Sequence, residues 1–229
     1  MEIRYQDDQW DLILRPMDVA DLEVTHNAIL ETDESPKRFM PWAHYEMTAE
    51  DHARLFMKFH AQYYLGVEYH LTCVDAKTGE FVMNFGILPQ QRFNRHSVEI
   101  GYWTAAKFQN LGIATLGVKI MSAVCFECLD CDRIFATTNV ENTASVRILE
   151  KCGMQKEGLL KNYLQAPSEK MISDGFSPER SSYIYALFPE DRQRLPWYKN
   201  ILMATRALSV FGKEFVLKEL SIPDSEPRS

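Results

Sequence analysis

Long apolar runs and an excess of positive charge are both absent from this chain. No uninterrupted apolar stretch approaches the roughly 20 residues that a membrane-spanning helix requires. The formal net charge is −7 at pH 7, which disfavours non-specific nucleic-acid binding, because such binding needs a basic face. Residues 1–8 are acidic and contain no apolar segment typical of a signal peptide. These features predict a soluble protein of the cytoplasm.

Closely spaced histidine pairs are also lacking, and the number of cysteines is odd, which favours reduced thiols. Three cysteines form the pattern Cys125-x-x-Cys128-x-x-Cys131, which superficially resembles a metal motif. The first two fall on a predicted helix, and the nearest further cysteine, Cys152, is far along the chain. We therefore interpret them, together with Cys73, as small buried side chains and predict no metal site.

The chain does have enough apolar material for a core, since 46% of its 229 residues are hydrophobic and 12% are aromatic. Alternation and helical periodicity predict the elements along the chain. Strands are expected at 11–15, 68–74, 81–88, 97–103, 133–138, 159–164 and 182–187, and helices at 18–32, 48–63, 112–129 and 142–152. Residues 89–96 and those leading up to 175 are predicted as loops. This order predicts an α/β fold with a mixed sheet.

A second apolar pattern follows this domain. Large or small apolar residues recur every three to four positions and predict one or two amphipathic helices: Trp197, Ile201, Ala204, Leu208, Phe211 and Phe215. We therefore divide the chain into a domain at 1–188, a C-terminal helical extension at 189–220 and a frayed tail at 221–229. The extension is compatible with docking on its own domain, covering an active-site mouth or pairing with a second subunit, and we predict a homodimer.

The most informative segment joins a strand to a helix. The run Ser97-Val-Glu-Ile-Gly-Tyr-Trp103 is predicted as a strand, and Gln109-Asn-Leu-Gly-Ile-Ala114 as a turn that opens onto an amphipathic helix. Such a turn leaves backbone N–H groups unpaired at the positive end of the helix dipole, where a pyrophosphate binds well. A plain strand–helix turn is the alternative interpretation.

Four segments in this order resemble one family when taken together. They are Met40-Pro-Trp-Ala43, Val98-Glu-Ile-Gly-Tyr-Trp103, Gln109-Asn-Leu-Gly-Ile-Ala114, and Asn142-Thr-Ala-Ser145 leading to Lys151-Cys-Gly-Met154. The chain resembles the ribosomal-protein N-acetyltransferase branch of the GNAT superfamily over about residues 12–187. It departs from that branch at Met154, in the loop 104–108 and in the extension after 189.

The resemblance implies a mostly antiparallel GNAT-type sheet flanked by helices, and acetyl transfer from acetyl-CoA to a primary amine. The favoured acceptor is the N-terminal α-amine of a protein or peptide. A small-molecule amine such as an antibiotic, polyamine or amino-sugar is the main alternative. A non-catalytic acyl-CoA-binding regulatory module is a third hypothesis, of a different class.

The resemblance also implies which residues hold the coenzyme. Backbone N–H groups would grip its diphosphate, and the strand that carries Trp103 would splay from its neighbour and expose further donors to the thioester. The implied coenzyme-binding residues are Tyr102, Trp103, Gln109, Asn110, Leu111, Gly112, Ile113, Ala114, Thr115, Asn139, Asn142 and Ser145.

Glu99 is the first candidate catalytic residue. It lies in mid-strand, on the face opposite Val98, Ile100 and Tyr102, and a carboxylate there needs a partner or a polar cavity. It is either a base for the incoming ammonium, acting directly or through water, or a structural carboxylate.

Ser145 is the second candidate, because the resemblance places it near the sulfur as a proton donor to the thiolate. Asn142 would contact the pantetheine arm, although simple helix capping also explains it. Tyr163 is an alternative proton donor or a core residue. Phe39 and Trp42, with the loop around Tyr163, would line the acceptor cleft, or would simply pack beneath a proline-rich loop.

Overall fold

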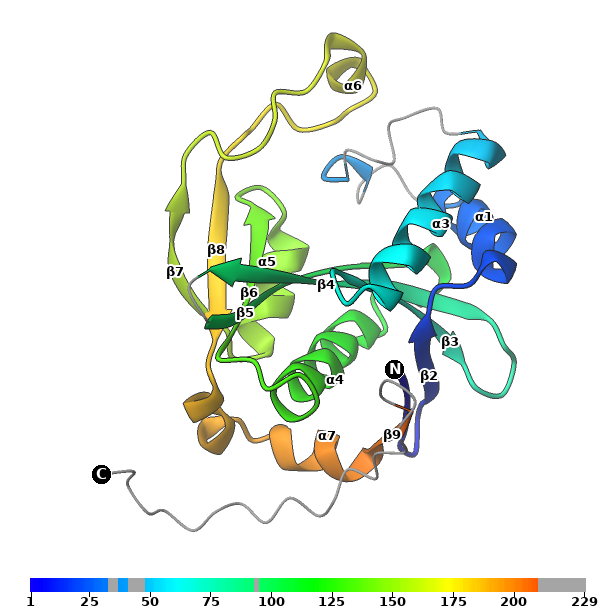
Figure 1. The fold of residues 1–229 in the computed structure, drawn as a ribbon. Coiled ribbons are helices and arrows are strands. Elements are labelled where there is room, and N and C mark those ends of the chain that lie inside the picture. Colours follow the sequence, from blue (N-terminus) through cyan, green and yellow to red (C-terminus); the bar gives the residue numbers. More distant parts are fainter. Residues whose placement is uncertain (33–36, 41–47, 93–94, 210–229) are drawn as a thin grey trace.

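A nine-stranded sheet with helices on both faces organises the chain (Figure 1). This is a computed structural model, and it describes residues 1–32, 37–40, 48–92 and 95–209. The strands follow the order β7-β8-β6-β5-β4-β3-β2-β1-β9, and β5 with β6 is the parallel pair among otherwise antiparallel described pairs. The predicted α/β fold with a mostly antiparallel sheet is therefore confirmed.

The elements have the following bounds. The strands are β1 Glu2–Gln6, β2 Asp11–Pro16, β3 Tyr69–Asp75, β4 Phe81–Arg92, β5 Arg95–Thr104, β6 Arg133–Asn139, β7 Gln155–Leu160, β8 Ser182–Leu187 and β9 Thr205–Ser209. The α-helices are α1 Leu22–Leu30, α3 Ala49–Tyr64, α4 Ile113–Glu127, α5 Thr143–Lys151, α6 Glu169–Ser173 and α7 Tyr198–Ala204.

The helices α1 and α3 cover one face of the sheet (Figure 1). Asp18 caps a 3₁₀ turn that leads into α1, and Thr48 with Asp51 forms the predicted capping box at the start of α3. Along α3, Phe56 and Tyr63 are buried toward the sheet, as the helical spacing of the aromatic residues predicts. The cap of α3 is therefore confirmed, whereas α1 is shorter than the predicted helix at 18–32 because its first turn is 3₁₀.

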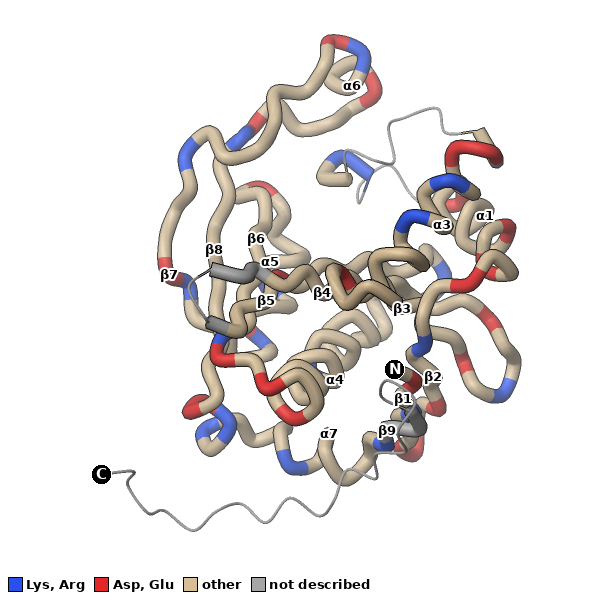
Figure 2. The backbone as a smooth tube through the Cα atoms, in the orientation of Figure 1, with Lys and Arg blue, Asp and Glu red and all other residues tan. Residues whose placement is uncertain are grey.

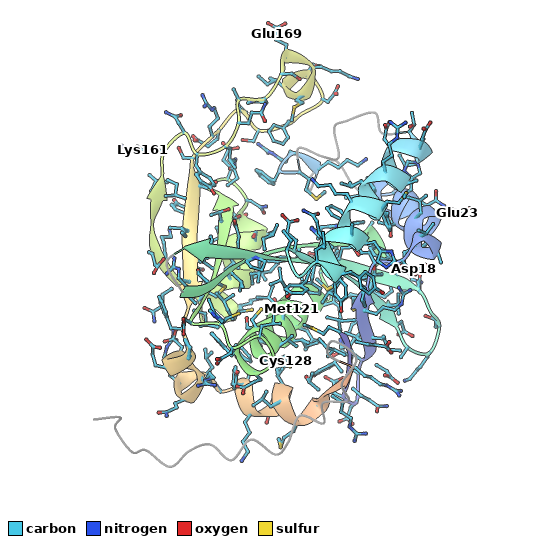
Figure 3. The ribbon with its side chains drawn as sticks, in the orientation of Figure 1. Asp18, Glu23, Met121, Cys128, Lys161 and Glu169 are labelled. Carbon is cyan, nitrogen blue, oxygen red and sulfur yellow. The ribbon has the colours of Figure 1, made fainter. Side chains whose placement is uncertain are left out.

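The helix α4 packs on the other face of the sheet, with α5 beside it (Figure 1). A Cβ at Gly117 would lie 2.3 Å from the Phe85 ring and 2.8 Å from the Met83 sulfur, so α4 approaches the sheet as closely as only glycine permits. Met121 of the same helix is fully buried and lies at the centre of the molecule in Figure 3, where Cys128 lies near the end of α4. The predicted close approach at Gly117 is confirmed.

The cysteines are placed as structural side chains. Cys73, Cys125, Cys131 and Cys152 are buried and Cys128 is half-buried. Burial raises the pKa of Cys152 to about 12 and that of Cys128 to about 11, so both stay protonated thiols near neutral pH. They therefore behave as small apolar side chains rather than as nucleophiles.

The C-terminal extension differs from its prediction. It begins with a 3₁₀ segment at Pro189–Arg194 and the helix α7, but α7 ends at Ala204 and the chain continues as the edge strand β9. The helical prediction is therefore wrong at Leu208. The reason is that the exposed edge of β1 offers unpaired backbone groups, and β9 pairs with it antiparallel. Phe211 and Phe215 lie outside the described residues, and the homodimer stays a prediction.

The strand expected at 159–164 lies instead at Gln155–Leu160, because the polar residues that precede Leu159 pair with β8 at the edge of the sheet. Three further segments also differ from the sequence-based prediction. β1 was not predicted, and the expected loop at 89–96 is instead the end of β4 and the start of β5. The expected polar loop before 175 contains the short helix α6, whose Glu169 projects from the body of the molecule in Figure 3.

Figure 2 shows acidic and basic residues interspersed along the backbone rather than gathered on one element. Among the described residues, no helix combines the length and the apolar character needed to cross a bilayer.

Candidate active site

The turn between β5 and α4 has the backbone conformation of an anion-binding site. Asn110 and Gly112 both have positive φ, of 60° and 80°, and Gly112 is the N-cap of α4. A Cβ on Gly112 would meet nothing within 4 Å, so the conformation, and not crowding, calls for glycine here. The Gln109 side chain donates to the Thr104 carbonyl at 3.1 Å, which fixes the turn against the end of β5.

The amides of this turn are not used by the fold. The helix ladder begins with the Leu116 N–H, which donates to the Gly112 carbonyl at 3.0 Å. The structure records no hydrogen bond from the backbone N–H groups of residues 110–115 to any described residue. Asn110, Leu111 and Gly112 are exposed, so these donors face solvent at the positive end of a 15-residue helix. This donor set fits the diphosphate of coenzyme A.

The strands β5 and β6 part beside this turn. They pair at Ser97–Arg133, Val98–Ile134 and Glu99–Phe135, and no further pair is recorded although both strands continue. The splay that the family resemblance implies for the Trp103 strand is therefore present. Beyond Glu99, the edge of β5 that faces β6 is left without ladder bonds, which makes its N–H groups available to a ligand.

A cavity of about 560 Å³ occupies this opening and extends beneath α1 and α3. Its size lies within the range of small-molecule sites. The described residues that line it come from α1, α3, β3, β4, β5, β6, α5, β8 and their loops: Met17, Thr25, Ile29, Phe39, Met40, His52, Leu55, Phe56, Phe59, His70, Asn84, Phe85, Gly86, Leu88, Ile100, Gly101, Tyr102, Trp103, Ala136, Thr137, Thr138, Asn139, Asn142, Ser145, Leu164 and Ser182.

Ser145 and Tyr102 form a hydroxyl pair in the cavity wall. The Tyr102 hydroxyl and Ser145 Oγ lie 3.1 Å apart, so either can donate to the other. Burial is the main cause that raises the pKa of Tyr102 above its usual range, and the hydrogen bond to Ser145 opposes it in part. Tyr102 is therefore a neutral hydroxyl at pH 7. Asn142 Oδ1 accepts from the Ser145 N–H at 3.1 Å, so the predicted helix cap is confirmed.

Glu99 lies directly behind the cavity wall. Its Oε1 accepts a hydrogen bond from the Thr137 hydroxyl at 2.8 Å, and Thr137 itself lines the cavity. Val98 and Ile100 are buried on the α4 face, so Glu99 points to the opposite, α3 face, as the alternation predicts. Both hypotheses for Glu99 survive, since one hydroxyl separates its carboxylate from the cavity.

The floor of the cavity on the α3 face is built from cross-strand pairs of β4 and β5. Gly86 pairs with Gly101, with Asn84 opposite Trp103 on one side and Leu88 opposite Glu99 on the other. A Cβ on Gly101 would meet nothing within 4 Å, so open space lies above this residue. Gly101 thus leaves a gap in the side-chain layer beside the point where β5 and β6 part, whereas the space above Gly86 is occupied by the His70 ring.

The sequence analysis missed two polar residues of this site, Asn84 and His70. His70 of β3 lies next to Gly86, its Nε2 is 3.0 Å from Glu68 Oε2, and its ring stacks on Phe59 with centroids 3.6 Å apart. Burial lowers the pKa of His70, and the neighbouring Glu68 opposes that shift. The alternation of side chains along β3 could have identified His70, because its neighbour Leu71 is buried on one face of the strand and His70 therefore lies on the other face.

Other predicted site residues have mixed outcomes. Phe39 lines the cavity, whereas Trp42 lies outside the described residues. Tyr163 is 52% exposed on the turn after β7, so its interpretation as a core residue is wrong. Asn139 lines the cavity, but its side chain is already bonded to the backbone of Glu141 and Glu179. A hydrogen bond from the Asn139 side chain to the coenzyme would therefore have to replace one of these bonds to the backbone.

Comparison with known proteins identifies the family. The sequence model of the acetyltransferase (GNAT) domain matches residues 11–155, which is more than half of the chain. The chain belongs to this family. The match ends within β7 and therefore covers α4, its amide-rich turn and the parting strands of this GNAT domain.

Curated relatives of this GNAT chain match over its central part. The L-amino acid N-acetyltransferase AaaT of Escherichia coli is 30% identical over 99 residues, or 43% of this chain and 59% of AaaT. The uncharacterized N-acetyltransferase YnaD of Bacillus subtilis is 29% identical over 99 residues, or 43% of this chain and 53% of YnaD. The matches thus span little more than half the length of these relatives.

Solved structures share the fold over most of the chain. RimJ of Mycobacterium smegmatis, solved in complex with CoA-disulfide, superposes with a TM-score of 0.72 at 24% identity, covering 89% of this chain and 94% of RimJ. The ribosomal-protein-S5-alanine acetyltransferase of Vibrio fischeri superposes with a TM-score of 0.67 at 17% identity, covering 82% and 97%. At these identities the likeness concerns the fold.

Proposed function

We propose that this GNAT chain transfers the acetyl group of acetyl-CoA to a primary amine, and that the favoured acceptor is the α-amine of a peptide or protein N-terminus. The observation that carries the proposal is the junction of two features. The amides of residues 110–115 are held against the end of β5, and β5 parts from β6 to open the cavity. A diphosphate bound at the turn would direct the rest of its carrier into that opening.

The residues of the site divide the work as follows. Backbone N–H groups of the turn, from Leu111 to Thr115, bind the diphosphate, and the unpaired edge of β5 holds the thioester carbonyl. The amine nitrogen attacks the carbonyl carbon, a C–N bond forms and the C–S bond breaks. Glu99 takes the amine proton, directly or through water at Thr137. The leaving thiolate takes a proton from the hydroxyl of Ser145, and Tyr102 can resupply it.

The character of the cavity favours an α-amine over the alternative acceptors. Among the described residues that line it there is no Asp, Glu, Lys or Arg. A polyamine or an amino-sugar antibiotic carries several positive charges and needs carboxylates, which this wall does not supply. Two proteins that this chain resembles, the ribosomal L7/L12 alpha-N-protein acetyltransferase RimL and the L-amino acid N-acetyltransferase AaaT, are also named for α-amine acceptors.

The direct test is transfer to a panel of amines. Purified chain is incubated with acetyl-CoA and free thiol is followed, with peptides of free α-amine, free amino acids, spermidine and an aminoglycoside as acceptors. We expect turnover with peptides and a mass increase of one acetyl group on the α-nitrogen. The same peptides with a blocked N-terminus are the control and should be inert. Tight binding of coenzyme A without turnover on any amine would instead favour the regulatory-module hypothesis.

A further inference from the structure

The part of the cavity between α1, α3 and β4, here called the acceptor half, has the chemical character to select the first residue of the acceptor. Resting on the proposed function, we infer that this chain selects α-amines whose own residue has a large apolar side chain, seated between α1, α3 and β4. Asn84 is the residue that accepts a hydrogen bond from a backbone N–H of the acceptor in this arrangement.

Apolar side chains surround this half of the cavity. They come from α1, α3, β4 and the segment 37–40, and include Ile29, Phe39, Met40, Leu55, Phe56, Phe59 and Leu88. Leu55 and Phe59 are half-buried and line the cavity, where the Phe59 ring stacks on His70. Protein interiors rarely keep voids much larger than a water molecule. An apolar space that shares a cavity of about 560 Å³ is therefore a ligand site rather than a packing fault.

The two histidines in this wall do not make it charged. His52 Nδ1 lies 2.6 Å from His26 Nδ1, and His70 bonds with Glu68. Burial is the first cause that lowers the pKa of both His52 and His70, so both rings are neutral at pH 7. A lysine, arginine, aspartate or glutamate in first position would lose its hydration here without finding an opposite charge among the described lining residues.

Unpartnered buried polar atoms mark where the polar part of the acceptor lies. Asn84 is 8% exposed and its Oδ1 has no hydrogen-bond partner among the described residues, and the same holds for the hydroxyl of Thr25, which is 2% exposed. Both residues line the cavity. An orphaned buried acceptor costs stability unless a ligand supplies a donor. Asn84 pairs with Trp103, and on the same face of the sheet the next pair is Gly86 with Gly101. A donor bound at Asn84 Oδ1 is therefore close to the place where β5 parts from β6.

The test compares peptides that differ in the first residue alone. Leu, Met, Phe, Ala, Ser, Lys and Asp are placed before one fixed neutral sequence, and kcat/KM is measured for each. We expect Leu, Met or Phe in first position to exceed Ala and Ser by roughly tenfold or more, since each added methylene buried is worth about 0.8 kcal/mol. Equal or better turnover of Ala and Ser would overturn the inference while leaving the proposed function intact.

Two variants at Leu55 localise the effect. Leu55→Trp fills the site and should lower kcat/KM for the Leu-first peptide about tenfold while leaving the Ala-first peptide nearly unchanged. Leu55→Glu should instead raise the relative rate of the Lys-first peptide, because it supplies the missing carboxylate. Met57 of the same helix is 66% exposed and lies outside the cavity lining, so Met57→Trp is the matched control and should change neither ratio.

A binding measurement separates this inference from the proposed function. The Leu-first and Ala-first peptides are titrated calorimetrically into the protein loaded with coenzyme A. Tighter binding of the Leu-first peptide that Leu55→Trp abolishes supports the side-chain site even if no acetyl group is transferred. Equal binding of both peptides by a folded, coenzyme-loaded protein overturns the site whatever the turnover.

Discussion

The two sides of the central sheet make different kinds of site. On the side of α4 and α5, the ligand is offered backbone N–H groups from one short stretch, residues 110–115. On the side of α1 and α3, the cavity wall is assembled from side chains of several distant segments. In the proposed function, the first site recognises a feature common to every molecule of coenzyme A, and the second distinguishes one acceptor from another. A fold built this way can change its acceptor without disturbing its grip on the acyl donor.

The largest expected effect tests whether the two sides meet above Gly101. A Cβ there would meet nothing within 4 Å, so Gly101→Leu should fold normally and place its side chain in the opening. We expect turnover to fall on the order of 100-fold, because the amine can no longer reach the thioester. Gly158→Leu in β7, where the added Cβ also has room, is the control and should keep full turnover. Wild-type turnover of a folded Gly101→Leu variant would show that the sides join elsewhere.

A pH-dependent effect is expected at Glu99, as large as that at Gly101 only near pH 6 and smaller above it. Glu99→Gln should lower turnover on the order of 100-fold near pH 6. The loss should become much smaller as the pH approaches the pKa of a free α-amine, which is near 8. At the higher pH the amine loses its proton without help, so the base matters less. The pH–rate profile of each variant is the measurement.

The paired variant Glu68→Gln decides between two proton routes. Two carboxylates are each bonded to a residue that lines the cavity. Glu68 is bonded to His70, and Glu99 is bonded to Thr137. If Glu68→Gln loses turnover near pH 6 and Glu99→Gln does not, the amine proton leaves through His70. A loss at Glu99→Gln that is equal at every pH would mean that this residue is architectural.

The contrast between the two sides also explains what could be predicted from sequence. The turn at 109–114, the cap at Asn142 and the close approach at Gly117 are local: each depends on one residue type at one position in a contiguous motif. Their geometry is present as predicted. The acceptor wall is not local, because Asn84 and His70 become neighbours of the opening through the pairing of β3, β4 and β5.

The extension shows the same limit from another direction. The helical period through Ala204 and Leu208 predicts one or two amphipathic helices, yet the chain leaves the helix at Ala204 and pairs β9 with β1. A distant strand edge that needs a partner overrode a local helical pattern. Long-range pairing of this kind leaves no trace in a short window of sequence, and β1 escaped prediction for the same reason.

A third experiment separates the conformation of Gly112 from its role in binding. Gly112→Val forces a branched side chain into a left-handed backbone conformation, which costs about 1–3 kcal/mol, so affinity for coenzyme A should fall about tenfold or more. Gly79 at the β3–β4 turn has φ 72° and open space, so Gly79→Val is equally strained but distant from the site. Calorimetry should find coenzyme A binding unchanged in Gly79→Val. Equal weakening in both variants would assign the effect to general destabilisation.

The smallest expected effect is a difference in acid stability between the two sides. Burial lowers the pKa of His52 and His70 on the acceptor side, whereas the unfolded chain titrates near the ordinary value of about 6.5. As the pH falls below that value the unfolded state binds protons that the folded state disfavours, so stability declines toward about pH 5. We expect Tm to fall by a few degrees and amides of α3 to exchange before those of α4. His52→Gln should flatten the decline and His96→Gln, at an exposed histidine, should not; simultaneous exchange of α3 and α4 would mean that the two sides unfold as one unit.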